Sequence, residues 1–253
     1  MIPTKHQRKQ QRRRRGIPPA PPQRSTFPLA LDPQVNEDDV LLVLWRALRD
    51  VYEWADSKGD GASELFPPLV EAVRNRFSSA SETEPALTEA LATFERLISE
   101  NGQLSREEVA EACSRTADWA GERGLTAVRA YFAEAAACVD TENPTWANLA
   151  ARACRREGDY ARAEIWYERA FKLGVRHGKK REQVWALLGY GAIMYTLGRY
   201  RRARMWYQRA ATRAARTNQP GEAAEAEHDL LTIESEIGSY RGGARHLSRA
   251  LTH

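Results

Sequence analysis

The sequence predicts an all-α protein in which pairs of helices stack into a solenoid. Two observations lead to this prediction. From residue 36 onward the apolar residues recur with the 3.6-residue period of a helix, and no segment alternates apolar and polar residues for long enough to form a strand. One helical pattern also occurs three times, beginning at Gly158, Gly198 and Gly238, at intervals of forty residues. A helix pair that repeats in this way cannot bury its apolar face alone, so neighbouring copies are expected to stack.

Breaks and capping signals divide the chain before the first repeated glycine into six helices. We expect them at about residues 36–57, 64–77, 85–100, 105–124, 126–139 and 144–157. Asn36 is a suitable N-cap for the first helix. Ser105 and Glu108 have the spacing of a capping box. Asn143 followed by Pro144 is typical of an N-cap and a first-turn proline.

Residues 1–33 are expected to form a disordered arm that is first basic and then rich in proline. Residues 1–24 carry eight Lys or Arg and no acid, and the arm has too few aliphatic side chains to offset the entropy of ordering it. Pro18, Pro19, Pro21 and Pro22 predict a stiff, extended spacer. Residues 25–143 carry a net charge of −13 and residues 144–253 one of +9. We therefore expect the spacer to let the arm reach back over the acidic surface of residues 34–143.

Composition and spacing predict four parts of the chain. After the arm (1–33) come an acidic helical region at 34–104, a candidate degenerate helix pair at 105–143, and three repeats at 144–253. Whether residues 34–104 are a separate domain or an extension of the solenoid stays open at this stage. No apolar run approaches the roughly 18 residues of a membrane span, and three scattered cysteines predict neither a disulfide framework nor a zinc site. We therefore expect a cytoplasmic protein.

The three repeat copies agree column by column. After each glycine, a tyrosine follows at two residues, a small residue at five, an aromatic or leucine at nine, and an alanine at twelve. The glycine permits a left-handed turn between two helices, and the small residue permits their close approach. The columns contain Gly158, Tyr160, Ala163, Tyr167 and Ala170 in the first copy, Gly198, Tyr200, Ala203, Tyr207 and Ala210 in the second, and Gly238, Tyr240, Gly243, Leu247 and Ala250 in the third.

This pattern resembles the tetratricopeptide repeat (TPR), whose second helix reads Gly-x-Tyr-x-x-Ala-x-x-x-Tyr-x-x-Ala. The first two copies match every column, and the third departs at two of them. Gly191 supplies the small residue that the family places in the first helix of the second copy. The copies are forty residues apart, against about 34 in the family, which is similar to the long repeats of bacterial regulatory and scaffold TPR proteins. The resemblance implies a right-handed solenoid that binds an extended peptide or a helix in its concave groove.

The resemblance also assigns groove residues. A basic rim beside an exposed Trp and Tyr predicts an acidic partner segment with an apolar anchor. The alternative is that Trp185 and Tyr195 belong to the core of the repeats. The assigned residues are Asn148, Arg152 and Arg155 from the first copy, Trp185, Leu188, Ala192 and Tyr195 from the second, and Glu225, His228 and Thr232 from the third.

No motif predicts catalysis, a cofactor or a metal site. The stretch DSKGDGASELFP resembles a calcium loop, but it has Lys58 at its third position and Pro67 at its twelfth, where a bidentate Glu is needed. The stretch GVRHGKK, which begins at Gly174, is two residues too short for a P-loop. Glu225 and His228 form a Glu-x-x-His pattern once, whereas a di-iron bundle needs it twice. We therefore expect a protein without enzymatic activity, cofactor or metal.

Two functions follow from these observations. The leading hypothesis is a protein–protein adaptor or scaffold that holds a partner segment in the groove. The alternative is a nucleic-acid-associated factor whose arm binds RNA or DNA while the repeats recruit a protein. The arm has no aromatic residue to stack on bases, so such contacts would be to phosphates; a tail that only aids solubility is a third interpretation. The arm's candidate contacts are Lys5, Arg8, Lys9, Arg12, Arg13, Arg14 and Arg15.

Overall fold

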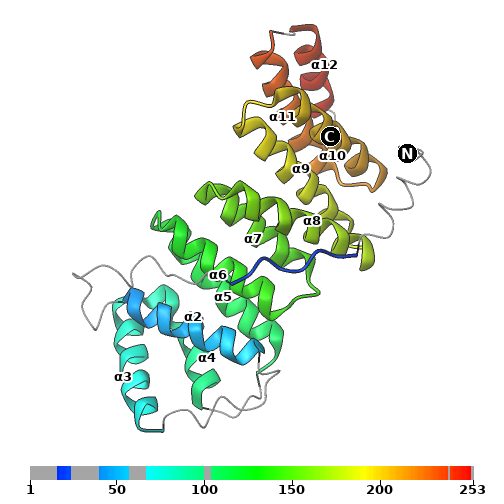
Figure 1. Ribbon diagram of the computed structural model, residues 1–253. Helices are drawn as coiled ribbons and strands as arrows, with labels where there is room; N and C mark the ends of the chain where they lie inside the picture. The colour runs from blue at the N-terminus through cyan, green and yellow to red at the C-terminus, as the bar shows by residue number, and fades with distance from the viewer. Residues whose placement is uncertain (1–15, 24–39, 57–66, 100–103, 239, 252–253) are drawn as a thin grey trace, which may run out of the picture. The chain divides into compact units, whose positions relative to one another are not determined.

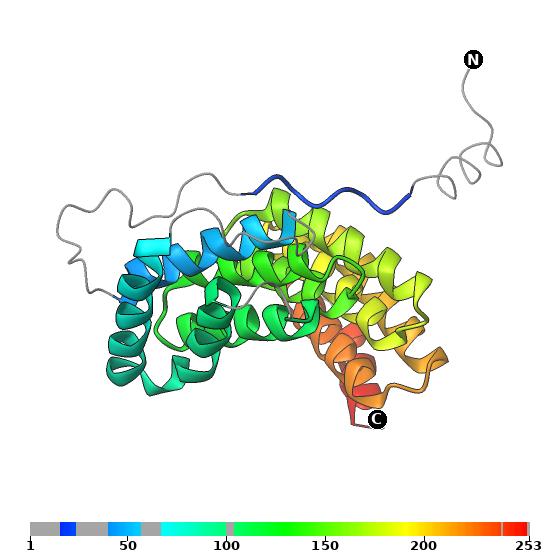
Figure 2. The same ribbon diagram turned by 90° about the horizontal axis from the view of Figure 1, so that it is seen from below.

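The computed structural model of the chain describes residues 16–23, 40–56, 67–99, 104–238 and 240–251, and Figures 1 and 2 show it from two sides. Within these ranges the protein is helical and contains no strand. The described residues form two compact units. One contains residues 22–163, and the other contains residues 164–253 together with residues 16–21. The boundary falls inside helix α8 (Tyr160–Arg176). The four parts expected from the sequence stay a prediction.

The first unit is a set of helices in which sequence neighbours pack against each other. From α3 to α7 each α-helix contacts the next one, and α2 packs against α3, α4 and α6. The elements are α2 (Val40–Asp56), α3 (Pro67–Thr83), the 3₁₀ turn η2 (Pro85–Leu87), α4 (Thr88–Ser99), α5 (Arg106–Glu122), α6 (Thr126–Val139) and α7 (Pro144–Glu157), followed by the first turn of α8.

The helix ends follow local chemistry. The Ser105 hydroxyl accepts from the Glu108 amide, and the Glu108 carboxylate accepts from the Ser105 amide, so the expected capping box is present. Asn143 caps α7 through the Thr145 amide. The expected end of the second helix at residue 77 is wrong, because α3 continues to Thr83. Ala80, three residues after buried Phe77, is buried too and extends the apolar face by a turn. The expected cap Asn36 lies outside the described residues.

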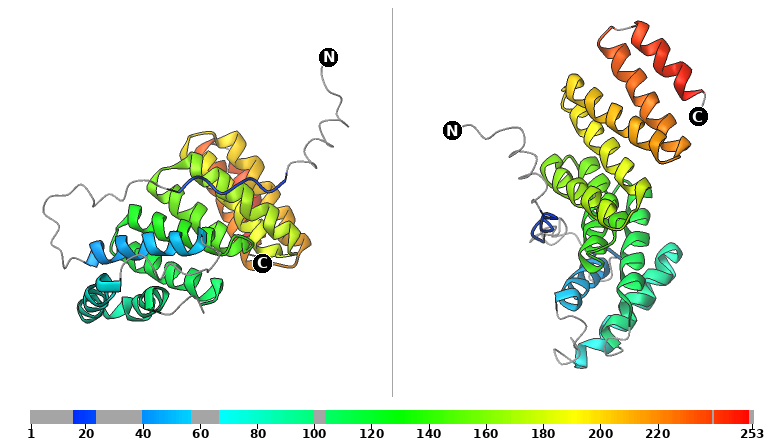
Figure 3. Two further views of the ribbon diagram at one scale, coloured as in Figure 1. Left: turned by 60° about the horizontal axis from the view of Figure 1, so that its bottom comes forward. Right: turned by 90° about the vertical axis from the view of Figure 1, so that its right-hand side faces the viewer.

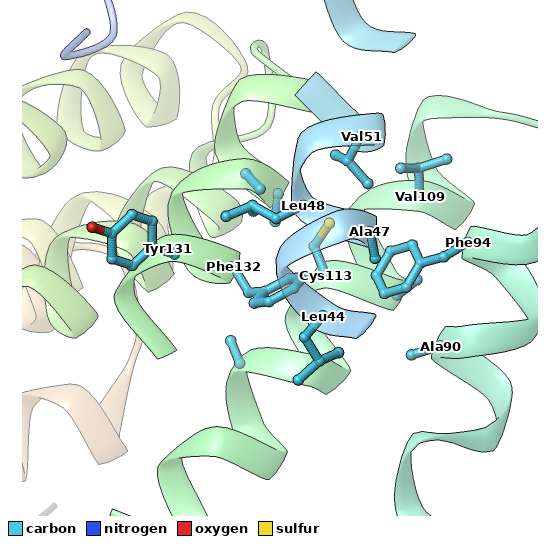
Figure 4. Packing of buried hydrophobic residues seen from close by; sticks show 14 of the residues in the cluster. Leu44, Ala47, Leu48, Val51, Ala90, Phe94, Val109, Cys113, Tyr131 and Phe132 are labelled. Carbon is cyan, nitrogen blue, oxygen red and sulfur yellow. The ribbon is translucent and has the colours of Figure 1, made fainter. Parts of the chain in front are cut away.

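Helix α2 provides much of the core of the first unit. Figure 4 shows Leu44 and Val51 of α2 among side chains of α4, α5 and α6. Phe94 of α4 and Phe132 of α6 lie with their ring centroids 6.1 Å apart. Cys113 of α5 is fully buried in the same core, and burial raises the pKa of its thiol. The thiol therefore stays protonated and packs as a small apolar side chain.

A buried ion pair joins α6 to the start of α8 within the first unit. The Glu134 side chain is only 2% exposed. The Arg162 guanidinium donates to Glu134 Oε1 from Nε at 2.8 Å and approaches it with Nη2 at 2.7 Å. Such a two-nitrogen contact offsets part of the cost of removing both charges from water.

The second unit is again built from helices that pack against their sequence neighbours. After α8 come α9 (Lys180–Thr196), α10 (Tyr200–Arg216), α11 (Pro220–Glu236) and α12 (Tyr240–Ala250). From α9 onward, each packs against the next one, as the yellow-to-red helices of Figure 3 show. The repeated glycines have left-handed backbone conformations, with φ of 66° at Gly198 and 72° at Gly238. Gly158, in the first unit, has φ of 96°. The fold is therefore an all-α helical-repeat solenoid.

Tyrosines of the repeat columns fill space that glycines of α9 leave open. A Cβ atom on Gly189 would lie 2.1 Å from Cζ of Tyr167, and one on Gly191 would lie 2.5 Å from Cε1 of Tyr207. Both tyrosines are buried. Helix α9 therefore receives one aromatic ring from the helix before it and one from the helix after it.

The other residues of the repeat columns differ in how far their side chains are buried. The four column alanines of the first two copies are completely buried, whereas the tyrosines that open α8 and α10 are half-buried. The side-chain surroundings of Tyr240 and Gly243 lie outside the described part. The buried alanines are Ala163, Ala170, Ala203 and Ala210; the half-buried residues are Tyr160, Tyr200 and Ala250, and Leu247 is exposed.

Gly189→Ala is expected to lower the free energy of unfolding by about 1–3 kcal/mol, because the added methyl group overlaps the Tyr167 ring. Urea denaturation of the full chain measures the loss. Gly221→Ala is the matched control, since nothing lies within 4 Å of a Cβ at that position. Equal stability of the two variants would contradict the proposed packing.

Arg162→Met is expected to destabilise the first unit by about 3 kcal/mol, because the buried Glu134 carboxylate loses its guanidinium partner. The double variant Arg162→Met with Glu134→Leu removes both charges and should recover most of the loss in a thermal or urea melt. A double variant that is less stable than Arg162→Met alone would show that the pair does not behave as a coupled unit.

Candidate partner-binding surfaces

The first candidate surface is the face formed by α9 and α11, which contact each other in the second unit. Each helix is the first of its repeat pair, the position that lines the predicted groove. Near their starts, Arg181 of α9 forms an ion pair with Glu222 of α11. Near their ends, the Tyr195 hydroxyl donates to Glu236 Oε1 at 3.4 Å. The two polar contacts hold the pair of helices in register at both ends.

Two aromatic side chains of α9 are partly exposed on this face. Trp185 is half-buried, and the Arg181 guanidinium lies 4.6 Å from its ring centroid. Tyr195 is half-buried, with its ring centroid 5.5 Å from that of Tyr200. Burial and the neighbouring Glu236 carboxylate raise the pKa of Tyr195, so its hydroxyl keeps its proton at neutral pH. The face thus presents two aromatic edges between charged groups.

The other predicted groove residues are placed differently. Leu188 is buried and serves the core of the second unit. Asn148 is buried as well, whereas Arg152 is exposed and Arg155 half-buried; all three lie on α7 in the first unit. The remaining predicted residues belong to the second unit: Ala192 and Thr232 are half-buried, and Glu225 and His228 are exposed.

The second surface is a cavity of about 950 Å³ between α8, α9 and α10, all within the second unit. Its aromatic wall includes Tyr190 and Trp206, which stack with ring centroids 4.8 Å apart. The Arg209 guanidinium covers Trp206 at 4.8 Å, and the Arg213 guanidinium lies 5.6 Å from the Phe171 ring. The cavity combines apolar area with cations, the composition of an anchor site for an aromatic or apolar side chain near acidic groups.

The third surface is the side of α8 that holds the proline-rich segment, residues 16–23, shown in dark blue in Figure 2. Arg169 Nη1 donates to the Pro18 carbonyl at 2.7 Å, and Lys172 Nζ donates to the Gly16 carbonyl at 2.8 Å; these four residues belong to the second unit. In the first unit, Arg162 Nη2 donates to the Pro22 carbonyl at 2.9 Å. Residues 16–23, expected to belong to a disordered arm as its stiff, extended spacer, instead contact α8 through these hydrogen bonds.

Sequence analysis missed both the cavity and the α8 side that holds the segment. Arg162, Arg169 and Lys172 lie seven and three residues apart, so one face of a helix carries all three, and this spacing was a usable signal. The acceptors left no signal, because they are backbone carbonyls. The basic arm residues Lys5 to Arg15 lie outside the described residues.

The described residues hold no group of three or more His, Cys, Asp or Glu side chains that could bind a metal ion. Within the described ranges, no helix is long and apolar enough to cross a membrane. Cys113, Cys138 and Cys154, all described, form no disulfide.

Comparison with known proteins agrees with this architecture. The tetratricopeptide repeat family matches residues 142–216. Among solved structures, the crystal structure of BtubC (BKLC) from P. vanneervenii is similar, with a TM-score of 0.55 and 19% sequence identity over 84% of this chain and 90% of that one. At this identity the likeness shows the fold alone. A search of curated proteins gave no significant match.

The glycine turns, the buried alanine columns and the helix-pair packing of residues 142–216 thus coincide with the matched family, and this part of the chain is a TPR-type helical-repeat region.

Proposed function

We propose that the protein is a non-enzymatic adaptor that captures a segment of a partner protein on the face formed by α9 and α11. Tetratricopeptide repeats are in general scaffolds for protein interaction. The observation that carries the proposal is the pair of half-buried aromatic side chains, Trp185 and Tyr195, on a face whose helices are joined at both ends. Partly exposed Trp and Tyr residues on a rigid surface are the usual anchors of protein interfaces.

The chemistry around Trp185 favours a partner segment with an apolar anchor and an acidic flank. The Arg181 side chain beside the ring is 64% exposed although it pairs with Glu222. The exposed Glu225 carboxylate on α11 would repel acidic residues of the partner segment on the α11 side. The acids of the partner are therefore expected to point toward α9.

The adaptor proposal includes a cytoplasmic location and no catalytic step. The cysteines form no disulfide, as in most proteins of a reducing compartment. No residue of the described part is assigned to substrate chemistry.

Trp185→Ala is expected to lower partner affinity by about 2 kcal/mol, roughly thirtyfold, because it removes the central anchor. Affinity capture from native cells with the full chain, followed by identification and titration of the captured protein, measures this. Trp45→Ala is the matched control, since Trp45 on α2 is 37% exposed and also lies near an arginine, Arg49. Equal loss in both variants, or in neither, would contradict capture on α9 and α11.

The alternative function is binding of RNA or DNA through the basic arm, for which the sequence supplies the observation. Seven Lys or Arg fall within residues 5–15. If five or six of these charges engage phosphates, log affinity should fall against log salt with a slope of about −4 to −5. Replacing the seven cations by Gln should bring that slope close to zero in a filter-binding assay. An unchanged slope would assign the arm a solubilising role and make the basic repeat surface the better candidate.

A further inference from the structure

The proline-rich segment bound to α8 has the chemistry of a ligand. Four of its eight residues are prolines, which fix φ and remove the amide hydrogen, so the segment favours the extended polyproline II conformation. This conformation makes no internal hydrogen bonds, and its carbonyl oxygens are free to accept from another surface. The Pro21 side chain is buried in the bound segment, whereas Pro19 and Pro22 are exposed.

The donors on α8 match this ligand in spacing. The chain of the segment runs antiparallel to the helix, because Gly16 lies at Lys172 and Pro18 lies at Arg169. Two residues of polyproline II span about 6 Å and three residues of α-helix about 4.5 Å, so the two donors stay within reach of their acceptors. Arg169 is 8% exposed.

One donor is also held by a contact other than that with the segment. Lys172 Nζ lies 2.7 Å from Glu168 Oε1 one turn earlier on α8. A donor that is already oriented loses little side-chain entropy when an acceptor arrives.

We propose that the α8 surface formed by Arg169 and Lys172 is a binding site for proline-rich segments of partner proteins, and that the chain's own proline-rich segment occupies it as a built-in competitor through residues 16–21. Both hydrogen bonds go to backbone carbonyls. The site therefore selects the polyproline II backbone rather than particular side chains. This surface is distinct from the α9–α11 face, and its proposal does not rest on the function proposed there.

Charge indicates which partner segment displaces the built-in one. The site presents two cations, and the chain's own segment is flanked in the sequence by Arg12–Arg15 on one side and Arg24 on the other. Like charges on ligand and site weaken the bound state. A proline-rich segment with neutral or acidic flanks lacks this repulsion. The built-in segment compensates because it belongs to the same chain, which keeps it at an effective concentration in the millimolar range.

The test uses full-length protein and a fluorescent peptide, GIPPAPPQ with blocked ends, together with the same peptide flanked by glutamates. In a variant that we call the released variant, Gly replaces Pro18, Pro19, Pro21 and Pro22. The built-in segment then loses more conformational entropy when it binds α8, so it leaves the site more readily. Fluorescence anisotropy should show that the peptide binds the released variant at least tenfold more tightly than the wild type. The glutamate-flanked peptide should bind more tightly still, and a peptide with all four prolines changed to Gly should not bind.

Arg169→Gln or Lys172→Gln in the released variant should weaken peptide binding at least tenfold. Arg162 is unsuitable for this purpose because replacing it also leaves the buried Glu134 carboxylate without its ion-pair partner, which destabilises the fold. Arg201→Gln is the matched control, since Arg201 lies exposed on α10, and it should leave binding unchanged. Circular dichroism melts establish that each variant is folded, and Lys172→Gln decides the result if Arg169→Gln is unfolded.

Equal affinity of the peptide for wild type and released variant would overturn the proposal, as would equal affinity of the Arg169→Gln, Lys172→Gln and Arg201→Gln variants. Sedimentation measures the oligomeric state and so tests the remaining alternative, in which the segment binds to a second copy of the chain. A wild-type dimer that the four Pro→Gly changes abolish would assign residues 16–23 to a second copy of the chain and not to competition with a partner.

Discussion

The close approach of helices through glycine is the constraint on which the repeat region depends. Tyr167 and Tyr207 are buried only because Gly189 and Gly191 leave the space of a Cβ atom open on α9. The fully buried alanines Ala163, Ala170, Ala203 and Ala210 extend the same principle along α8 and α10. Large aromatic rings beside very small residues give close packing without voids, which bulky pairs at these columns would prevent.

This packing uses one side of α8 and leaves the other side available. The face with Ala163, Tyr167 and Ala170 packs into the helical array, and the face with Arg169 and Lys172 receives the backbone of residues 16–21. Since α8 is fixed by its buried face, its cations keep constant spacing along the helix. The packing of α8 and the binding role proposed for it therefore do not compete for the same side chains.

The sequence was sufficient for features whose causes are local or periodic. Helix α6 (Thr126–Val139) and helix α7 (Pro144–Glu157) have the bounds expected from the Asn143–Pro144 signal and apolar period, and the repeat glycines form the expected turns. Sequence pattern did not reveal Gly189, because its partner Tyr167 lies in a neighbouring helix. The resemblance assigned Leu188 to the groove, and that side chain is buried. The bound segment was missed because its acceptors are carbonyls, which every residue has.

The position of the bound segment changes the electrostatic argument about the arm. Arg12–Arg15 directly precede Gly16 in the sequence, and Gly16 accepts from Lys172 on α8. Under the proposal for α8, like charges so close in sequence to the bound segment oppose its hydrogen bonds. A polyanion that neutralises the arm would then remove this repulsion and strengthen the built-in segment on α8. If the arm binds a polyanion and α8 captures a proline-rich partner, as proposed above, each event therefore weakens the other.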